Sequence, residues 1–312
     1  MEYRTVGHSG LQVSAIGLGC NNFGMRLDQV ESSAVVAAAL DVGITFFDTS
    51  DSYGEGASEE YLGAAVGHRR DDVVIATKFS SRMGPGPYQS GASRKYLTKA
   101  CEASLRRLQT DYLDLYYQHW VDPLTPIEET LDTLDSLVRM GKVRYIGCSN
   151  VASWELARAD HVARERGRQR FVACQNQWSL LHRDIEAEVV PACTAYGVGI
   201  IPYFPLASGL LTGKYGKDRE YPVGSRLATL PYFRKMATDD AFAAVERLQL
   251  VSDSMGRSLT DVALSWLLHQ PMVAGILVGA TTASQVATNA LATELSLSIE
   301  ELAAISQAAS LE

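Results

Sequence analysis

The sequence lacks an excess of positive charge, a long apolar run and the beginning of a secretory signal. Its 312 residues include 28 lysines and arginines against 36 acidic residues, which gives a net charge of −8. Because nucleic-acid-binding proteins usually carry the opposite balance, no nucleic-acid partner is expected. No apolar run reaches the roughly 18 residues that a membrane-spanning helix needs, so no membrane association is expected either. The first residues show neither a basic nor an apolar region, which favours the cytoplasm over export.

Cysteine and histidine are few and scattered along the chain. The five cysteines include no CxxC pair, and the six histidines include no HExxH motif or comparable spacing of metal ligands. The simplest interpretation is five reduced, buried thiols in a cytoplasmic protein. No metal site is therefore expected.

What fills most of the chain is an alternation of short apolar runs with helical patterns. Runs that are apolar throughout, rather than at every second position, are typical of strands covered on both faces. Eight candidate strands are found at residues 15–18, 46–49, 73–77, 113–118, 143–148, 172–175, 199–203 and 275–278. Helical patterns follow near residues 28–42, 58–67, 93–108, 126–140, 153–166, 184–196, 240–268 and 283–292.

Eight strand–helix units in series predict a closed parallel (β/α)₈ barrel that forms a single α/β domain over residues 1–312. Residues 2–14 predict an N-terminal β-hairpin, and Ser298 with Glu301 predicts the start of a closing C-terminal helix. A doubly wound open sheet is the alternative. Its GxGxxG fingerprint between a strand and a helix is missing, which favours the barrel.

Two loops are longer than ordinary connections, at residues 80–92 and 213–236. The second loop follows the seventh strand, and barrels often bind phosphate in the loops after strands 7 and 8. It predicts a lid over an anionic ligand, the alternative being a solvated surface loop. Its two acidic residues, Asp218 and Glu220, are outnumbered by six basic ones: Lys214, Lys217, Arg219, Arg226, Arg234 and Lys235.

Polar residues stand at the carboxyl ends of three successive strands, where a barrel gathers its catalytic groups. These are Asp48, Lys78 and His119, and Tyr53 follows five residues after Asp48. Each alone has an ordinary structural explanation, but their shared position favours a joint role. The next strand ends supply Ser149, Asn150, Gln175 and Tyr203.

These four groups suit proton donation to a carbonyl oxygen that is becoming an alkoxide. A phenol has a pKa of about 10, and a neighbouring ammonium is expected to lower it, with a carboxylate holding the ammonium in place. An imidazole can orient the same oxygen. No serine or cysteine nucleophile with its base is evident, so a hydride from a nicotinamide is the simplest source for the acceptor carbon.

The chain resembles the aldo-keto reductase family from end to end. The resemblance implies a (β/α)₈ barrel that reduces small aldehydes or ketones with NADPH. It also implies Tyr53 as proton donor, Lys78 and Asp48 as the pair that tunes it, and His119 as the orienting group. The matching segments are 15–20, 47–54, 76–78, 104–108, 111–115, 118–119, 141–150, 175–178, 203–215 and 279–280, with Gln285 and Asn289.

The resemblance further implies where the cofactor binds. Ser149, Asn150 and Gln175 would hold the nicotinamide amide, with Tyr203 stacked on its ring. The stretch from Leu206 to Lys214 would wrap the pyrophosphate, and residues 279–289 would hold the adenosine end. The full set of expected contacts is Gly19, Cys20, Ser149, Asn150, Gln175, Tyr203, Phe204, Leu206, Gly209, Lys214, Arg226, Gly279, Thr281, Gln285 and Asn289.

One departure from the family concerns the 2′-phosphate of NADPH. Many relatives carry Arg or Lys just after the position of Gly279, whereas this chain has Thr281 and Thr282. Hydroxyls donate hydrogen bonds but bring no charge. Arg226 in the lid is then the expected source of that charge, and NADH remains an alternative cofactor.

The substrate is expected beside aromatic residues. Family members with a long C-terminal loop use it to wall the substrate pocket, and that wall is not expected here. The expected neighbours of the substrate are then Phe23, Trp120, Trp178 and the loop at residues 80–92.

Two other functions are compatible with the same residues. In a Schiff-base aldolase Lys78 would be the nucleophile, but this needs a lowered lysine pKa, and Asp48 would favour the ammonium. Alternatively, some members of the family are regulatory subunits that sense NADPH and bind a membrane channel. The complete set of four polar groups favours an enzyme.

Overall fold

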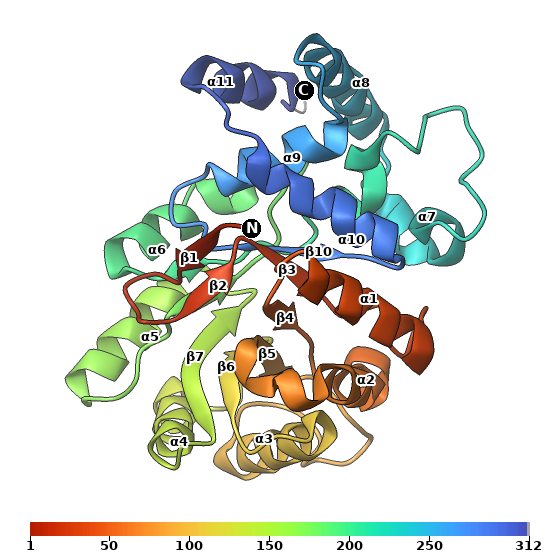
Figure 1. Cartoon of the computed structure of the whole chain (residues 1–312). Helices are drawn as coiled ribbons and strands as arrows, with labels where there is room; N and C mark the ends of the chain where they lie inside the picture. The colour runs from red at the N-terminus through yellow and green to blue at the C-terminus, as the bar shows by residue number, and fades with distance from the viewer. Residues whose placement is uncertain (311–312) are drawn as a thin grey trace.

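Eight parallel strands curl around the centre of the molecule and helices cover their outer face (Figure 1). The structure, a computed structural model, describes residues 1–310. The strands are β3 (Ile16–Gly19), β4 (Phe46–Asp48), β5 (Val74–Phe79), β6 (Leu113–Gln118), β7 (Val143–Ser149), β8 (Ala173–Gln175), β9 (Gly199–Ile200) and β10 (Ile276–Gly279).

The strands follow one another around the barrel in the order β10-β3-β4-β5-β6-β7-β8-β9. Parallel bridges from Ile200 to Val273 and from Tyr203 to Leu277 join the two ends of this order. The predicted (β/α)₈ barrel is therefore confirmed. The expected strand at 199–203 pairs regularly only over its first two residues, because Pro202 has no N–H to donate to a ladder.

The N-terminal hairpin, β1 (Tyr3–Thr5) with β2 (Gln12–Ser14), is antiparallel as predicted. It brings Val6, Leu11 and Val13 into one buried cluster with side chains from inside the barrel, among them Phe46 and Leu115. The cluster fills the end of the barrel at which the strands begin. The opposite end, where the strands finish, is left for the polar residues.

Helices connect the strands and pack around them. Capping supports the boundaries, since the Asp28 side chain accepts from Glu31 N and Ser298 accepts from Glu301 N, each in a capping box. The helices are α1 (Gln29–Asp41), α2 (Ala57–Val66), α3 (Arg94–Leu108), α4 (Ile127–Arg139), α5 (Ser153–Glu165), α6 (Val189–Tyr196), α7 (Arg226–Thr229), α8 (Asp239–Ser254), α9 (Leu259–Leu268), α10 (Ala283–Ala290) and α11 (Ile299–Ala308).

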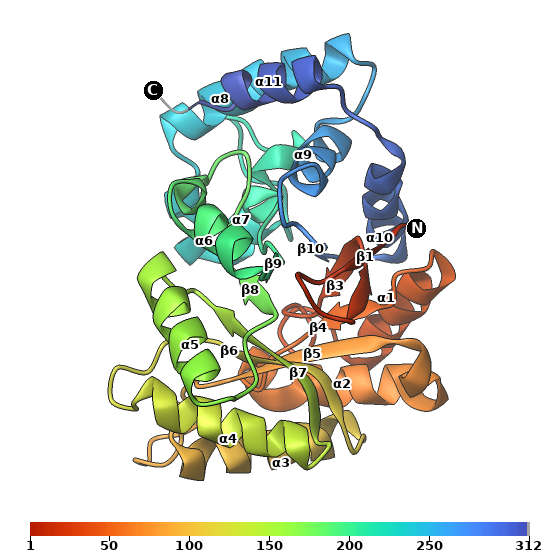
Figure 2. The ribbon, with the colours of Figure 1, turned by 90° about the vertical axis from the view of Figure 1, so that its left-hand side faces the viewer.

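The helical pattern expected at 240–268 is divided into two helices, the second of which starts at the cap that Ser258 and Asp261 predict. Gly256, with φ of 63°, turns the chain after α8, and the Ser258 side chain caps α9 by accepting from Asp261 N. The break lets α8 lie beside the closing helix α11 at one edge of the molecule (Figure 2). No helix within residues 1–310 is both long and apolar enough to span a membrane.

Candidate active site

A cavity of about 1150 Å³ opens where the barrel strands finish. Asp48, Tyr53 and His119 line it, and Lys78 lies fully buried next to them. The other predicted site residues on its wall are Gly19, Trp120, Ser149, Asn150, Gln175, Tyr203, Phe204, Leu206, Gly209, Lys214, Arg226, Gly279, Thr281, Gln285 and Asn289.

The ammonium group of Lys78 is held in a fixed position. It donates to the Asp48 carboxylate and to the Thr49 carbonyl oxygen at 2.8 Å, and it lies 3.4 Å from the Tyr53 hydroxyl oxygen. Gln175 Nε2 donates to the other Asp48 oxygen at 2.8 Å. Since an ammonium has three hydrogens, two are used to anchor it and the third points to the Tyr53 phenol.

The pKa of Tyr53 departs from the expectation that Lys78 brings it down. Burial raises the pKa of the phenol, and the Lys78 ammonium offsets only part of this effect. The ammonium therefore acts in the expected direction, but burial outweighs it, and the pKa of Tyr53 stays above its ordinary value. As a consequence Tyr53 is a protonated donor at neutral pH rather than a phenolate.

Lys78 keeps its charge despite its burial. Burial alone would lower the pKa of its ammonium, but the Asp48 carboxylate and the Tyr53 phenol raise it above its ordinary value. A Schiff-base nucleophile needs the opposite shift. The geometry therefore argues against the aldolase alternative.

His119 completes the group as a neutral ring. Burial, together with the charge of Lys78, lowers its pKa to about 3. The ring meets that of Tyr53 edge-on, with centroids 6.0 Å apart, and stacks on Trp120 at 5.4 Å. Its Nδ1 lies 3.1 Å from Ser81 Oγ and 3.3 Å from Ser50 Oγ. A neutral imidazole held in this way can orient a carbonyl oxygen without protonating it.

A second polar group lies on the neighbouring strand ends. Asn150 has a left-handed backbone, with φ of 55°, and its Oδ1 accepts from the Tyr203 hydroxyl at 2.7 Å. Its Nδ2 donates to the carbonyl oxygen of His119 and to Ser149 Oγ, both at 3.0 Å. Ser149 Oγ in turn donates to the Gln175 carbonyl oxygen at 2.7 Å. Strain of this kind in a non-glycine residue is typical of functional sites.

The loop after β9 places a lysine on the wall of the cavity. Ala207, Ser208 and Gly209 follow one another with φ of 45°, 58° and 97°, and the N–H groups of Ala207 and Gly209 donate to the carbonyl oxygens of Phe204 at 2.9 Å and Leu206 at 2.8 Å. Lys214 lies against this segment, so close that a Cβ on Gly209 would stand 2.9 Å from Lys214 Nζ. The Lys214 ammonium, which lines the cavity, is the group of this loop that fits the pyrophosphate of a dinucleotide.

Only some of the lid's positive charge faces the cavity. Lys214, Arg226 and Lys235 line it, whereas Lys217 pairs with Asp239 at 2.9 Å. Arg234 donates instead to carbonyl oxygens of its own lid, that of Leu227 at 2.8 Å among them. The positive charge that the lid presents to the cavity thus comes from three side chains and not from all six basic residues of the loop.

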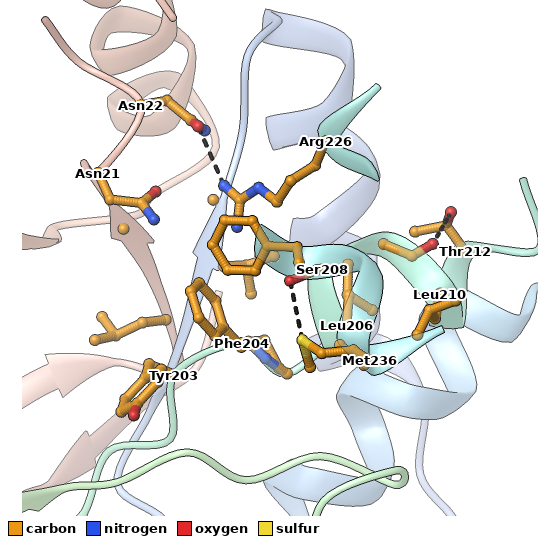
Figure 3. Close-up of a pocket in the computed structure, with 18 of the residues that line it drawn as sticks. Asn21, Asn22, Tyr203, Phe204, Leu206, Ser208, Leu210, Thr212, Arg226 and Met236 are labelled. Atoms are coloured by element: carbon orange, nitrogen blue, oxygen red, sulfur yellow. Dashed lines mark hydrogen bonds between the residues drawn. The ribbon is translucent and has the colours of Figure 1, made fainter. Parts of the chain in front are cut away.

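Arg226 spans the cavity from the lid to the loop after β3. Its Nη2 donates to Asn22 Oδ1 at 3.2 Å (Figure 3). Its guanidinium packs over the rings of Phe204 and Phe233, and no carboxylate within residues 1–310 forms an ion pair with it. Burial lowers its pKa, and the nearby Arg26 lowers it further. Arg26 likewise donates to a carbonyl oxygen, that of Gly224 at 2.6 Å, and within residues 1–310 neither arginine pairs with a carboxylate, so this part of the cavity suits an anion.

Besides Lys78, three expected site residues do not line the cavity. Cys20 and Phe23 are fully buried behind its wall. Trp178 is also buried, where Nε1 donates to Glu186 at 2.9 Å and the ring meets Trp266 edge-on. Cys20 is therefore removed from the expected cofactor contacts, and Phe23 and Trp178 from the expected substrate contacts.

The cavity instead receives residues that were not expected. Gln177 lines it in place of its neighbour Trp178, and Asn21, Asn22 and Arg26 line it in place of Cys20 and Phe23. The rule that polar residues just after a barrel strand face the mouth applies to Asn21 and Asn22, which follow β3. Applied to β3, this rule predicts Asn21 and Asn22 as cavity residues.

Residues 15–310 match the sequence model of the Aldo/keto reductase family. The chain belongs to this family. As an aldo/keto reductase it is an oxidoreductase of a family that acts on small carbonyl compounds.

Curated relatives cover nearly the whole chain. A probable voltage-gated potassium channel subunit beta of Oryza sativa subsp. japonica is 36% identical over 298 residues, which are 93% of this chain and 90% of that protein. The L-glyceraldehyde 3-phosphate reductase of Escherichia coli (strain K12) is 36% identical over 322 residues, 98% of this chain and 92% of that protein. Probable aldo-keto reductase 1 of Glycine max is 37% identical over 310 residues, 97% and 87% respectively.

Proposed function

We propose that this aldo/keto reductase transfers a hydride reversibly between NADPH and a small aldehyde or ketone, with Tyr53 as general acid. The observation that carries the proposal is the position of the Tyr53 hydroxyl oxygen beside the anchored Lys78 ammonium. With its other two bonds fixed by Asp48 and Thr49, the ammonium faces the Tyr53 hydroxyl oxygen at 3.4 Å, and the neutral ring of His119 lies beside it.

Each of the four side chains has a separate task. His119 donates a hydrogen bond to the substrate carbonyl oxygen and holds it next to Tyr53. Tyr53 gives its proton to this oxygen as negative charge develops there, and Lys78 stabilises the phenolate that remains. Asp48 keeps Lys78 charged and in place. The nicotinamide, when bound, supplies the hydride.

The wall of the cavity matches an extended dinucleotide. Ser149, Asn150 and Gln175 carry the amide and hydroxyl groups that a carboxamide needs, and Tyr203 presents its ring beside them. Lys214, beside the loop at 207–209, suits the pyrophosphate through its positive charge. Gly279, Thr281, Gln285 and Asn289 line the far end, where the adenosine would lie.

Arg226 is the residue on which the preference for NADPH is expected to depend. Replacing Arg226 with alanine should raise the KM for NADPH about tenfold or more, because a charged hydrogen bond to the 2′-phosphate is lost. The KM for NADH should change little. Steady-state kinetics with both cofactors measure the difference. Arg219→Ala, which removes a lid arginine that does not line the cavity, is the matched control. Equal effects on both cofactors would refute this role.

A regulatory role is the second candidate, since relatives in Oryza sativa and Arabidopsis thaliana are named as probable potassium channel subunits. Prompt turnover separates the two functions. Protein preloaded with NADPH and mixed with 4-nitrobenzaldehyde in a stopped-flow instrument should lose its NADPH fluorescence within seconds. Bound NADPH that persists unoxidised would favour the regulatory role over the enzyme.

A further inference from the structure

A buried carboxyl group lies behind His119, and the proposed reaction gives it no task. Asp51 belongs to the loop between β4 and Tyr53, and only 1% of its surface is exposed. One oxygen accepts from Ser50 Oγ at 3.2 Å. The other oxygen is buried and accepts no hydrogen bond within residues 1–310, since the nearby Tyr96 hydroxyl donates to the Ser81 carbonyl oxygen at 3.0 Å. Both oxygens of a buried carboxylate normally accept hydrogen bonds, so a carboxyl group with one unbonded oxygen requires an explanation.

Its surroundings favour a carboxyl that holds a proton. The charged and titratable groups that face it are Glu59 from α2, Arg107 and Tyr96 from α3, and Tyr116 from β6. Arg107 Nε donates to Glu59 at 2.6 Å, so its positive charge is paired with that carboxylate rather than with Asp51. Burial, and then the charge of Glu59, raises the pKa of Asp51 to about 7. Asp51 therefore changes its protonation state in the neutral range.

The Ser50 hydroxyl connects Asp51 to His119. Its oxygen lies 3.2 Å from Asp51 Oδ1, 3.3 Å from His119 Nδ1 and 3.0 Å from Ser52 Oγ. A hydroxyl has a single hydrogen to donate. When Asp51 is ionised it accepts that hydrogen, and Ser50 then presents only a lone pair to Nδ1. When Asp51 is protonated it can donate to Ser50, whose own hydrogen becomes free for Nδ1.

We propose that Asp51 is a positioning residue that determines, through the Ser50 hydroxyl, which ring nitrogen of His119 carries the hydrogen. The inference rests on the proposed carbonyl reduction, because only a hydrogen on Nε2 can be donated to a substrate oxygen. Nε2 has no partner within residues 1–310, and the ring lines the cavity. Protonated Asp51 favours this tautomer, and ionised Asp51 favours the hydrogen on Nδ1.

Ser81 limits the size of this effect. Its hydroxyl lies 3.1 Å from Nδ1 and can donate to it at any pH, independently of Asp51. It therefore supports the Nε2–H tautomer in both states of Asp51. Replacing Ser81 with alanine should enlarge the dependence on Asp51, which is a result that a purely structural role for Asp51 does not produce.

The first test observes the ring directly and needs no turnover. Protein labelled with ¹⁵N-histidine is titrated between about pH 5.5 and 8.5, and the His119 signals are assigned with His119→Gln. In the wild type the Nδ1 and Nε2 shifts should move towards the Nδ1–H tautomer as the pH rises through about 7. In Asp51→Asn, whose amide can donate permanently to Ser50, the Nε2–H pattern should persist throughout. Identical titrations in the two proteins would overturn the proposal.

The second test is the pH profile of carbonyl reduction. The wild-type kcat/KM should fall about fivefold from pH 6 to pH 8.5, the equivalent of one hydrogen bond, and Asp51→Asn should be flat over this range. Asp114→Asn is the matched control, since Asp114 is a buried carboxylate on β6 that pairs with Arg70 and Arg144 and does not line the cavity. It should keep the wild-type profile. A flat profile in this control as well would overturn the proposed role of Asp51.

Two further results keep the inference separate from the proposed function. If Asp51→Asn does not fold, Ser50→Ala breaks the same connection and should flatten both the titration of His119 and the pH profile. Turnover that is absent at every pH would refute the proposed function. The ring titration would still test whether Asp51 determines the tautomer of His119. Turnover whose kcat/KM depends on pH in the same way in the wild type and in Asp51→Asn would refute the proposed role of Asp51 and leave the proposed function intact.

Discussion

Tyr53→Phe should lower kcat for carbonyl reduction about 10³-fold and leave the affinity for NADPH close to that of the wild type. The substitution removes the hydroxyl that faces Lys78 at 3.4 Å and keeps the ring that packs against His119. Steady-state rates with 4-nitrobenzaldehyde and quenching of NADPH fluorescence measure the two quantities. A hydride can still be delivered, but the alkoxide that forms has no proton donor.

A second tyrosine provides the control for this variant. Tyr112 lies just before β6, at the opposite end of the barrel, where its hydroxyl donates to Asp71 at 2.6 Å. Tyr112→Phe should leave kcat unchanged. If Tyr53→Phe keeps more than about a tenth of the wild-type kcat, the phenol is not the general acid.

Lys78→Met should damage both turnover and stability. Loss of the ammonium should lower kcat about 10²- to 10³-fold, because the phenolate left on Tyr53 is no longer stabilised. The Asp48 carboxylate is then buried without its cation, which should cost about 3–5 kcal/mol of unfolding free energy. Rates and urea unfolding measure the two effects.

The double variant Lys78→Met with Asp48→Asn separates these two effects. Removing both charges avoids an unpaired buried carboxylate, so most of the unfolding free energy should return while kcat stays low. Recovery of kcat together with stability would show that Lys78 serves only to hold the fold. Wild-type stability in the single variant would show that Asp48 and Lys78 are not energetically coupled.

Position along the barrel explains why much of the site could be anticipated from the sequence. Asp48, Lys78 and His119 each end or follow a strand, and a parallel barrel brings all such positions to one mouth however far apart they are in the chain. The hairpin and the eight strands follow from local patterns of apolar residues. The family resemblance then extends this reasoning to Ser149, Asn150 and Gln175.

The errors arise where the three-dimensional surroundings decide. Whether Gln177 or Trp178 faces the cavity depends on the path of an irregular loop, which no periodicity encodes. The pKa of Tyr53 depends on how much water its pocket excludes, and burial outweighs the lysine beside it. Likewise, Lys217 counts as a lid charge in the sequence but is paired with Asp239 in the fold.

The hairpin at the other end of the barrel has a consequence for the order of events. Val6, Leu11 and Val13 close that end with apolar side chains, so the cavity at the opposite end does not continue through the barrel. A ligand that lies deeper in the cavity must bind first and dissociate last. If the dinucleotide lies deeper in the cavity than the carbonyl compound, binding is ordered. The cofactor is then exchanged only after the product has dissociated.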